Sequence, residues 1–266
     1  MLTHGLLEGK RGIIFGALNE KSLAWAVAEQ CAAEGGKLVL TNTPHALRLG
    51  SLQQLSIEIN APVISADATS MDDLRHLFVE SEEILGGKID FILHAVAMSQ
   101  NMRRGKSYEE ANYSYMQQTL DISALSLHKI LQTAYRLDAL NEYASVVALS
   151  FLASQRAFLG YNDMADAKAL LESIARNYGM IYGKKRHVRI NTVSQSPTLT
   201  KAGTAIGNGV ERFFDISDRT SPLGNATAQD CARFCVMLFS DYTRKVTMQN
   251  LYHDGGFSTT GVQLQE

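Results

Sequence analysis

Short apolar segments alternate with longer amphipathic stretches along this chain. In the amphipathic stretches, apolar residues recur every third or fourth position, as at Leu23, Val27 and Cys31, until the glycine pair Gly35-Gly36 ends the pattern. Continuous apolar strands separated by helices predict a parallel β-sheet that is covered by helices on both faces. The predicted strands are residues 12–16, 37–41, 62–65, 89–95, 144–149, 188–193 and 249–253, and the further predicted helices are residues 47–59, 71–85, 113–137, 164–182 and 228–239.

The alternation continues without a break from one end of the chain to the other. The sequence has no internal repeat and no low-complexity tract, and it contains only four prolines, so no linker divides it. A chain of 266 residues that is 45% hydrophobic can bury a full core. We therefore expect residues 1–266 to form a single doubly wound α/β domain.

Charge and cysteine content exclude several classes of protein. The formal net charge of -2 and the isoelectric point near 6.4 give no global reason to expect nucleic acid or an anionic membrane as partner. No segment is long and apolar enough for a signal peptide or a membrane span. Three cysteines argue for a reducing compartment, and Cys231 and Cys235 lack a second pair at ligand spacing, so buried thiols are expected rather than a metal site. The chain is expected to be cytoplasmic.

The loop after the first predicted strand, residues 15–24, is the first candidate for cofactor binding. Ligands of doubly wound sheets bind beyond the carboxyl ends of the strands. The loop lacks a Gly-x-Gly-x-x-Gly pattern, but Gly16 keeps a tight turn, and Ser22 with the following helix could offer N–H groups to a pyrophosphate. The second strand ends in Asn42 and Thr43 rather than in the acidic residue typical of an NAD ribose site. By itself the loop is equally consistent with a plain strand–helix turn.

Tyr161 and Lys168 form the most informative pair in the chain. If this stretch is helical, the lysine lies about 20° off the face of the tyrosine and roughly 10 Å further along the axis. An ammonium group favours negative charge on a phenol or on its ligand, and the phenol can pass a proton to a developing oxyanion. The spacing alone is weak, because Tyr178 and Lys185 repeat it.

Six short motifs, in order along the chain, resemble the bacterial enoyl-acyl carrier protein reductases, a divergent branch of the short-chain dehydrogenase/reductases. The similarity runs from about Leu7 to Ser258. The Tyr-x6-Lys spacing matters most, because ordinary members of the superfamily carry Tyr-x-x-x-Lys, which this chain lacks. The motifs are Gly16-x5-Ser22-Leu-Ala24, Asp67-Ala68, Asp121-Ile-Ser123, Tyr161-x6-Lys168, Ser196-Pro197-x-x-Thr200 and His253-Asp-Gly-Gly-Phe-Ser258.

The resemblance implies a single Rossmann-type domain with a seven-stranded parallel sheet and a nicotinamide cofactor, NADH, with NADPH not excluded. It also implies reduction of trans-2-enoyl thioesters carried on acyl carrier protein, in fatty acid elongation, by a homotetramer. The spacing suits this chemistry, because hydride goes to C3 while charge develops on the oxygen at C1. An acid placed one helical turn further from the lysine, roughly 4.5 Å, can follow that oxygen.

The resemblance also implies a role for each matching residue. For the cofactor these are Gly16, Ser22 and Leu23 at the pyrophosphate and ribose, Thr43 near the adenine ribose, Asp67 and Ala68 at the adenine, Ala95 after the fourth strand, Lys168 at the nicotinamide ribose, and Pro197 and Thr200 beside the nicotinamide and pyrophosphate. For catalysis and substrate they are Tyr161 and Lys168, the Phe151 position, Ala97, and Ala202 within a mobile substrate-binding segment at about 197–218. No metal is implied.

Three positions depart from the family pattern. Ala95-Val-Ala97 replaces Ser-Ile-Gly, and Thr43 replaces an amide side chain, which weakens a preference for NADH over NADPH. Phe151 replaces the first of two active-site tyrosines, so it can pack against a substrate but cannot donate a hydrogen bond. Two alternatives therefore stay open, namely a catalytically weak dinucleotide-binding sensor or scaffold, and a carbonyl reductase of the same superfamily.

Overall fold

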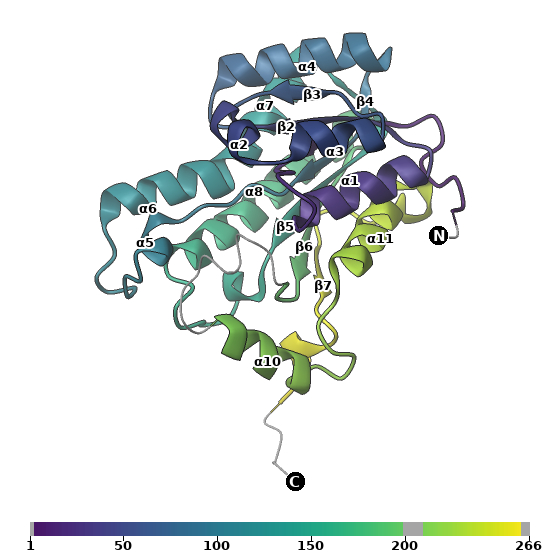
Figure 1. Cartoon of the computed structure of the whole chain (residues 1–266). Helices are drawn as coiled ribbons and strands as arrows, with labels where there is room; N and C mark the ends of the chain where they lie inside the picture. The colour runs from purple at the N-terminus through teal and green to yellow at the C-terminus, as the bar shows by residue number, and fades with distance from the viewer. Residues whose placement is uncertain (1–2, 199–209, 262–266) are drawn as a thin grey trace.

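Seven parallel strands form the sheet at the centre of the computed structural model, which describes residues 3–198 and 210–261 (Figure 1). The strand order is β3-β2-β1-β4-β5-β6-β7, so the order reverses beside β1 and β4. All seven predicted strands and the doubly wound fold class are confirmed. The strands are β1 (Arg11–Phe15), β2 (Lys37–Asn42), β3 (Val63–Ser65), β4 (Ile89–His94), β5 (Leu140–Ser150), β6 (Arg189–Gln195) and β7 (Asn250–His253).

Helices cover both faces of the sheet (Figure 1). On one face α1 and α11 pack together over a core that contains Trp25 and Val27, and on the other face α4, α7 and α8 cover a core that contains Leu77 and Ile130. The helices are α1 (Leu23–Ala33), α2 (Pro44–Leu49), α3 (Leu52–Glu58), α4 (Met71–Leu85), α5 (Gln100–Arg103), α6 (Tyr113–Leu120), α7 (Ser126–Leu137), α8 (Asp163–Arg186), α10 (Val210–Thr220) and α11 (Ala228–Phe239).

Two predicted helices are interrupted. The prediction of one helix over residues 47–59 is wrong, because Gly50 and Ser51 separate α2 from α3. A Cβ at Gly50 would lie 2.4 Å from the carbonyl oxygen of Leu18, and the N–H of Ser51 donates to that same oxygen at 3.2 Å. The predicted helix at 113–137 contains a π-helical turn, η1 (Asp121–Leu125), between α6 and α7. Amphipathic periodicity did not reveal either break.

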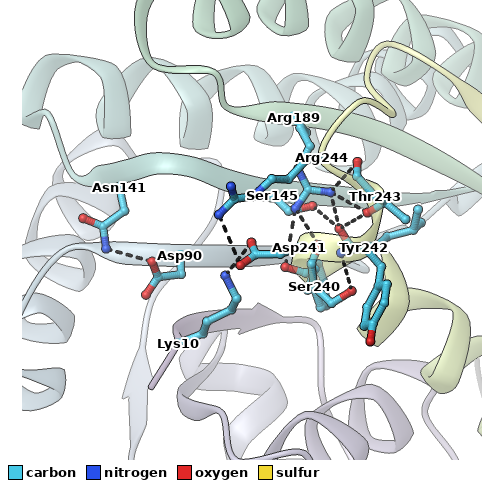
Figure 2. A network of polar contacts seen from close by, with 12 residues as sticks. Lys10, Asp90, Asn141, Ser145, Arg189, Ser240, Asp241, Tyr242, Thr243 and Arg244 are labelled. Carbon is cyan, nitrogen blue, oxygen red and sulfur yellow. Dashed lines mark hydrogen bonds and ion pairs between the residues drawn. The ribbon is translucent and has the colours of Figure 1, made fainter. Parts of the chain in front are cut away.

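A buried arginine fixes the carboxyl end of α11 (Figure 2). Arg189, on β6, is 1% exposed, and its guanidinium donates to the carbonyl oxygens of Leu238 at 2.7 Å, Ser240 at 3.1 Å and Thr243 at 3.1 Å. A cation at a helix carboxyl end is favourable because it pairs with carbonyls that have no partner within the helix. Ser145 of β5 donates to the same Leu238 oxygen at 2.7 Å, so sheet and helix are held in register.

The described ranges contain no helix of the length and apolarity needed to cross a membrane. Within those ranges no group of three or more histidine, cysteine or acidic side chains is arranged to hold a metal ion. Cys31, Cys231 and Cys235 are free buried thiols between α1 and α11, which confirms the prediction of buried thiols for the last two.

Candidate active site and cofactor pocket

A cavity of about 250 Å³ lies beyond the carboxyl ends of β1, β2 and β3. Four residues expected to contact the cofactor line it, namely Gly16, Thr43, Asp67 and Ala68. Part of the wall is formed by Gln118 of α6 and by Asp121 and Ile122 of the π-helical turn. These three residues were not among those expected to contact the cofactor. The full lining is Phe15, Gly16, Thr41, Asn42, Thr43, Ala66, Asp67, Ala68, Thr69, Val96, Gln118, Asp121 and Ile122.

Gly16 lies where the loop after β1 contacts the loop after β4. Its φ is 97°, and a Cβ there would lie 2.2 Å from the carbonyl oxygen of Ala95. Only glycine fits such an approach. The turn after β1 is therefore packed directly against the loop after β4, at the point where the strand order reverses.

Ser22 organises the remainder of the first loop from within. Its hydroxyl donates to the carbonyl oxygen of Asn19 at 2.7 Å and accepts from the N–H of Leu18 at 3.3 Å. Leu23 opens α1 and packs, half-buried, against the core beneath the helix. Ser22 and Leu23 therefore lie at the junction of the loop and α1.

The rim of the cavity is braced by side chains that bond to one another. Asp67 accepts from the N–H and the hydroxyl of Thr69 at 2.8 and 2.7 Å. Lys129, from α7, donates to Asp121 at 2.7 Å and to the carbonyl oxygen of Thr69 at 3.0 Å. Thr43 caps α2 through the N–H of Ala46 at 3.2 Å. These bonds hold this wall of the cavity in shape.

Tyr161 lies in the segment that leads into α8, not on the helix itself. The helix begins at Asp163, and its N-cap Asn162 has φ 44° and ψ -142°. The prediction that the tyrosine and the lysine share one helical face is therefore wrong in its geometry. The non-helical residue Asn162 lies between Tyr161 and the start of α8. The distance from Tyr161 to Lys168 is therefore set by a turn followed by a helix.

Lys168 is buried on α8 and points at β5. It is 6% exposed, and its ammonium donates to the carbonyl oxygen of Leu149 at 2.8 Å. Burial lowers the pKa of Lys168 to about 8, and the negative charge of Glu172 one turn away opposes that fall. Burial raises the pKa of Tyr161, so its phenol is a neutral hydrogen-bond donor at physiological pH.

Aromatic rings surround the tyrosine. The ring of Phe151 lies 4.7 Å from that of Tyr161, and Phe158 lies 6.2 Å from it. Phe213, on α10, packs edge-on against Phe158 at 4.5 Å, and Phe257 lies 6.0 Å from Phe213. Phe158 was not predicted, whereas Phe213 belongs to the substrate-binding segment expected at about 197–218 and Phe257 to the last of the six motifs, although neither was given a role of its own. The result is an apolar environment beside the ring of Tyr161.

The remaining predicted residues lie on two neighbouring loops or outside the described ranges. After β4, Ala95 is half-buried and Ala97 is exposed, while Pro197 follows β6 and is half-buried. Thr200 and Ala202 lie outside the described residues, as does the whole of 199–209 within the expected mobile segment at 197–218, and the end of that segment, from 210 onward, belongs to α10.

Glu172 anchors the turn after β5 and was not predicted. It is 3% exposed and accepts from the hydroxyl of Ser150 at 2.7 Å and from the amide of Gln155 at 3.0 Å. Tyr252 of β7 in turn donates to Gln155 at 2.8 Å. No periodic pattern distinguishes such a glutamate from a solvent-facing one, because only the fold buries it.

A doubly wound parallel sheet with a glycine turn at its switch point and a tyrosine–lysine pair beside it defines a nucleotide-binding oxidoreductase related to the short-chain dehydrogenases. The family model described as enoyl-(acyl carrier protein) reductase matches residues 16–258. The NADH-type enoyl-acyl carrier protein reductase FabI of Rickettsia bellii is 32% identical over 98% of both chains, and enzyme 2 of Rhizobium meliloti is 31% identical over 99% of this chain and 97% of its own. This chain belongs to the enoyl-acyl carrier protein reductase family.

Solved structures agree with this membership. The FabI–NADH complex from Alistipes finegoldii has a TM-score of 0.95 and 55% identity, covering 97% of this chain and 91% of that one. A Bacillus cereus enoyl-acyl carrier protein reductase described with NADP+ and indole naphthyridinone has a TM-score of 0.89 and 25% identity, covering 97% and 99%. Within the family, therefore, both forms of the dinucleotide occur in solved complexes.

Proposed function

We propose that this protein reduces the conjugated double bond of trans-2-enoyl thioesters carried on acyl carrier protein, with NADH, in fatty acid synthesis. The observation that carries the proposal is the pair Tyr161 and Lys168. A neutral phenol lies among aromatic rings, and a buried ammonium group follows on α8 beside the carboxyl end of β5. Family membership supplies the substrate class.

The cavity suits the adenosine half of a dinucleotide. It lies at the switch point of the sheet, its glycine turn allows close backbone approach, and Asp67 and Thr43 offer polar atoms at its wall. We assign Gly16, Ser22 and Leu23 to the pyrophosphate, and Asp67 with Ala68 to the adenine. Ala95 would pass along the cofactor, and Pro197 with Thr200 would flank the nicotinamide.

When bound, the cofactor would provide hydride, which the substrate would accept at C3. The phenol of Tyr161 would donate its proton to the oxygen at C1, where negative charge develops, and the enol would then take up a proton at C2 and lose the one on oxygen, which gives the saturated thioester. Lys168 binds the ribose hydroxyls and places positive charge near that oxygen. Phe151, beside Ala97 and Ala202 in the proposed substrate site, contributes contact area and no proton.

NADH is the cofactor we assign, because the relative with 55% identity is a FabI–NADH complex. Thr43 follows β2 directly and lines the cavity, so it is the residue we expect to report on the choice. Its hydroxyl already caps α2. We expect NADPH to be used more slowly.

We also propose that the protein is cytoplasmic and forms a homotetramer. In each chain, residues 1–266 would form a single domain that both binds the dinucleotide and carries out catalysis. Exposed apolar side chains on α6 and α8 support an interface there, with Tyr113 79% and Ile181 48% exposed. Arg212, exposed on α10, is a candidate contact for the acidic carrier protein. Its partner in this role, Lys201, lies outside the described residues.

The test is NADH oxidation, followed by near-ultraviolet absorbance, with a crotonyl thioester, with enoyl-acyl carrier protein and with a 3-ketoacyl thioester. We expect turnover of the two enoyl substrates and little of the ketone. Faster turnover of the ketone would identify a carbonyl reductase. NADH binding without any turnover would identify a sensor or scaffold, and either result would overturn the proposal. NADPH, tested in parallel, decides the cofactor preference.

A further inference from the structure

The first residue of α8 is a buried carboxyl group that the proposed chemistry does not use. Asp163 is 0% exposed and stands two residues after Tyr161. Its carboxyl oxygens accept three side-chain hydrogen bonds, from Ser99 Oγ at 2.6 Å, Asn101 Nδ2 at 2.7 Å and Thr119 Oγ1 at 2.9 Å. A carboxyl group this deep is costly unless its lone pairs are satisfied, and here they are.

The three donors come from segments beyond the cofactor-facing loop. Ser99 caps α5 through the N–H of Met102 at 3.0 Å, and Asn101 accepts from the N–H of Asn112 at 2.9 Å, at the start of α6. Asp163 thus ties the chain after Ala95-Val96-Ala97 to the start of α8. The same segment also contacts η1, because the N–H of Met98 donates to Ser123 Oγ at 2.9 Å.

The residue between the tyrosine and this anchor has strained backbone geometry. Asn162 has φ 44° and ψ -142°, a combination that costs a non-glycine residue about 1–3 kcal/mol. Its own amide donates to the carbonyl oxygen of Lys106 at 2.7 Å and accepts from the N–H of Asp163 at 2.6 Å. Such a turn persists only where both sides are held, and Asp163 holds the helical side.

We propose that Asp163 is a positioning residue for Tyr161, which sets the phenol at a fixed distance from the cofactor-facing loop after β4. The proposal rests on the proposed reductase function. It makes Asp163, through Asn101 and Thr119, responsible for the alignment of the proton donor with the cofactor, and it leaves cofactor binding itself to other residues.

Reciprocal exchange of two side chains tests the proposal. In Asp163→Asn, one amide faces the amide of Asn101, and in Asn101→Asp, two carboxyl groups face each other. The double variant restores one donor and one acceptor with unchanged net charge. Because small misplacements at a reacting centre are costly, each single variant should lose roughly 10- to 100-fold in kcat with enoyl thioester, with the Kd for NADH changed less than about twofold. The double variant should return to within about threefold of wild type.

Two further measurements separate positioning from folding and from the assigned reaction. Thr119→Val removes one of the three donors and should fold even where the single exchanges do not, with kcat lowered severalfold. The 13C resonance of the labelled Tyr161 ring, identified by its loss in Tyr161→Phe, should move in Asp163→Asn and return in the double variant, whatever substrate the enzyme uses. A well-folded Asp163→Asn or Thr119→Val with wild-type kcat, or an unmoved Tyr161 resonance, would overturn the proposal, and an inactive wild type with a moving resonance would count against the reductase function alone.

Discussion

Replacing Lys168 by methionine should make the protein more stable at neutral pH while it removes activity. Burial lowers the pKa of this lysine from 10.5 to about 8, so keeping it charged in the folded state opposes folding. At pH 7 both folded and unfolded states are protonated, and the cost is about 3 kcal/mol, since a tenfold change in a proton-binding constant corresponds to about 1.4 kcal/mol. Methionine lacks the charge and loses the hydrogen bond to the Leu149 oxygen, which contributes about 1 kcal/mol. The expected net gain is about 2 kcal/mol.

The pH dependence of the stability difference between Lys168→Met and wild type shows whether the buried charge causes it. Between pH 8 and 10.5 the folded wild type binds fewer protons at Lys168 than the unfolded chain does, so its stability rises with pH relative to the variant. The advantage of Lys168→Met should therefore shrink to near zero by about pH 10. Urea unfolding at both pH values, at one protein concentration and without cofactor, measures this difference. A variant that is less stable than wild type at pH 7, or a gain that does not change with pH, would refute the reasoning.

Three other predictions concern the effect of Phe151 on turnover, the contribution of Arg189 to stability and the binding of acyl carrier protein. Phe151→Tyr should fold normally with equal or higher turnover, and severe loss of activity in the folded variant would remove Phe151 from the substrate site. Arg189→Met should lower the free energy of unfolding by roughly 2–4 kcal/mol, because it leaves buried carbonyl oxygens at the end of α11 without a hydrogen-bond donor. The control Arg244→Met, at an exposed arginine, should lower it by less than about 1 kcal/mol. Equal effects of the two variants in urea unfolding would contradict this prediction. Lys201→Glu with Arg212→Glu should raise the KM for enoyl-acyl carrier protein at low salt and leave a short neutral thioester unaffected, and an equal change for both substrates would place the carrier protein elsewhere.

The sheet was predictable because its inner strands contain short apolar runs between helical stretches. β4 is buried along nearly its whole length and β5 from Ala144 to Ser150, and these are the parts that the apolar runs identified. The breaks at Gly50 and in η1 were not predictable in the same way. The break at Gly50 goes with the close approach to the carbonyl oxygen of Leu18, and η1 lies where Asp121 and Ile122 line the cavity, while helical periodicity in the sequence continues through both.

The residues of the candidate site that belong to a sequence motif were predictable. Those that take part only through contacts between distant segments were not. The Tyr161–Lys168 spacing and the Gly16 turn can be read from the sequence; in the structure Gly16 lines the cavity and the ammonium of Lys168 donates to the carbonyl oxygen of Leu149 in β5. Asp163 and Glu172 read as surface acids in a helical stretch, and only their burial against other elements gives them a role. Phe213 lies in the segment that was expected to bind substrate, but its contact with the Phe158 ring joins residues far apart in the chain, which sequence spacing does not indicate.

The most direct test of the account is the hydride-transfer rate of Tyr161→Phe in a single turnover. The variant keeps the ring that packs against Phe151 and loses only the hydroxyl, so NADH should bind with a Kd within about twofold of wild type. The rate of NADH oxidation on rapid mixing with enoyl thioester should fall about 100-fold or more, because the developing enolate loses its proton donor. A transfer rate equal to that of wild type, in a variant that still binds NADH, would contradict the central claim that Tyr161 is the acid of this reductase.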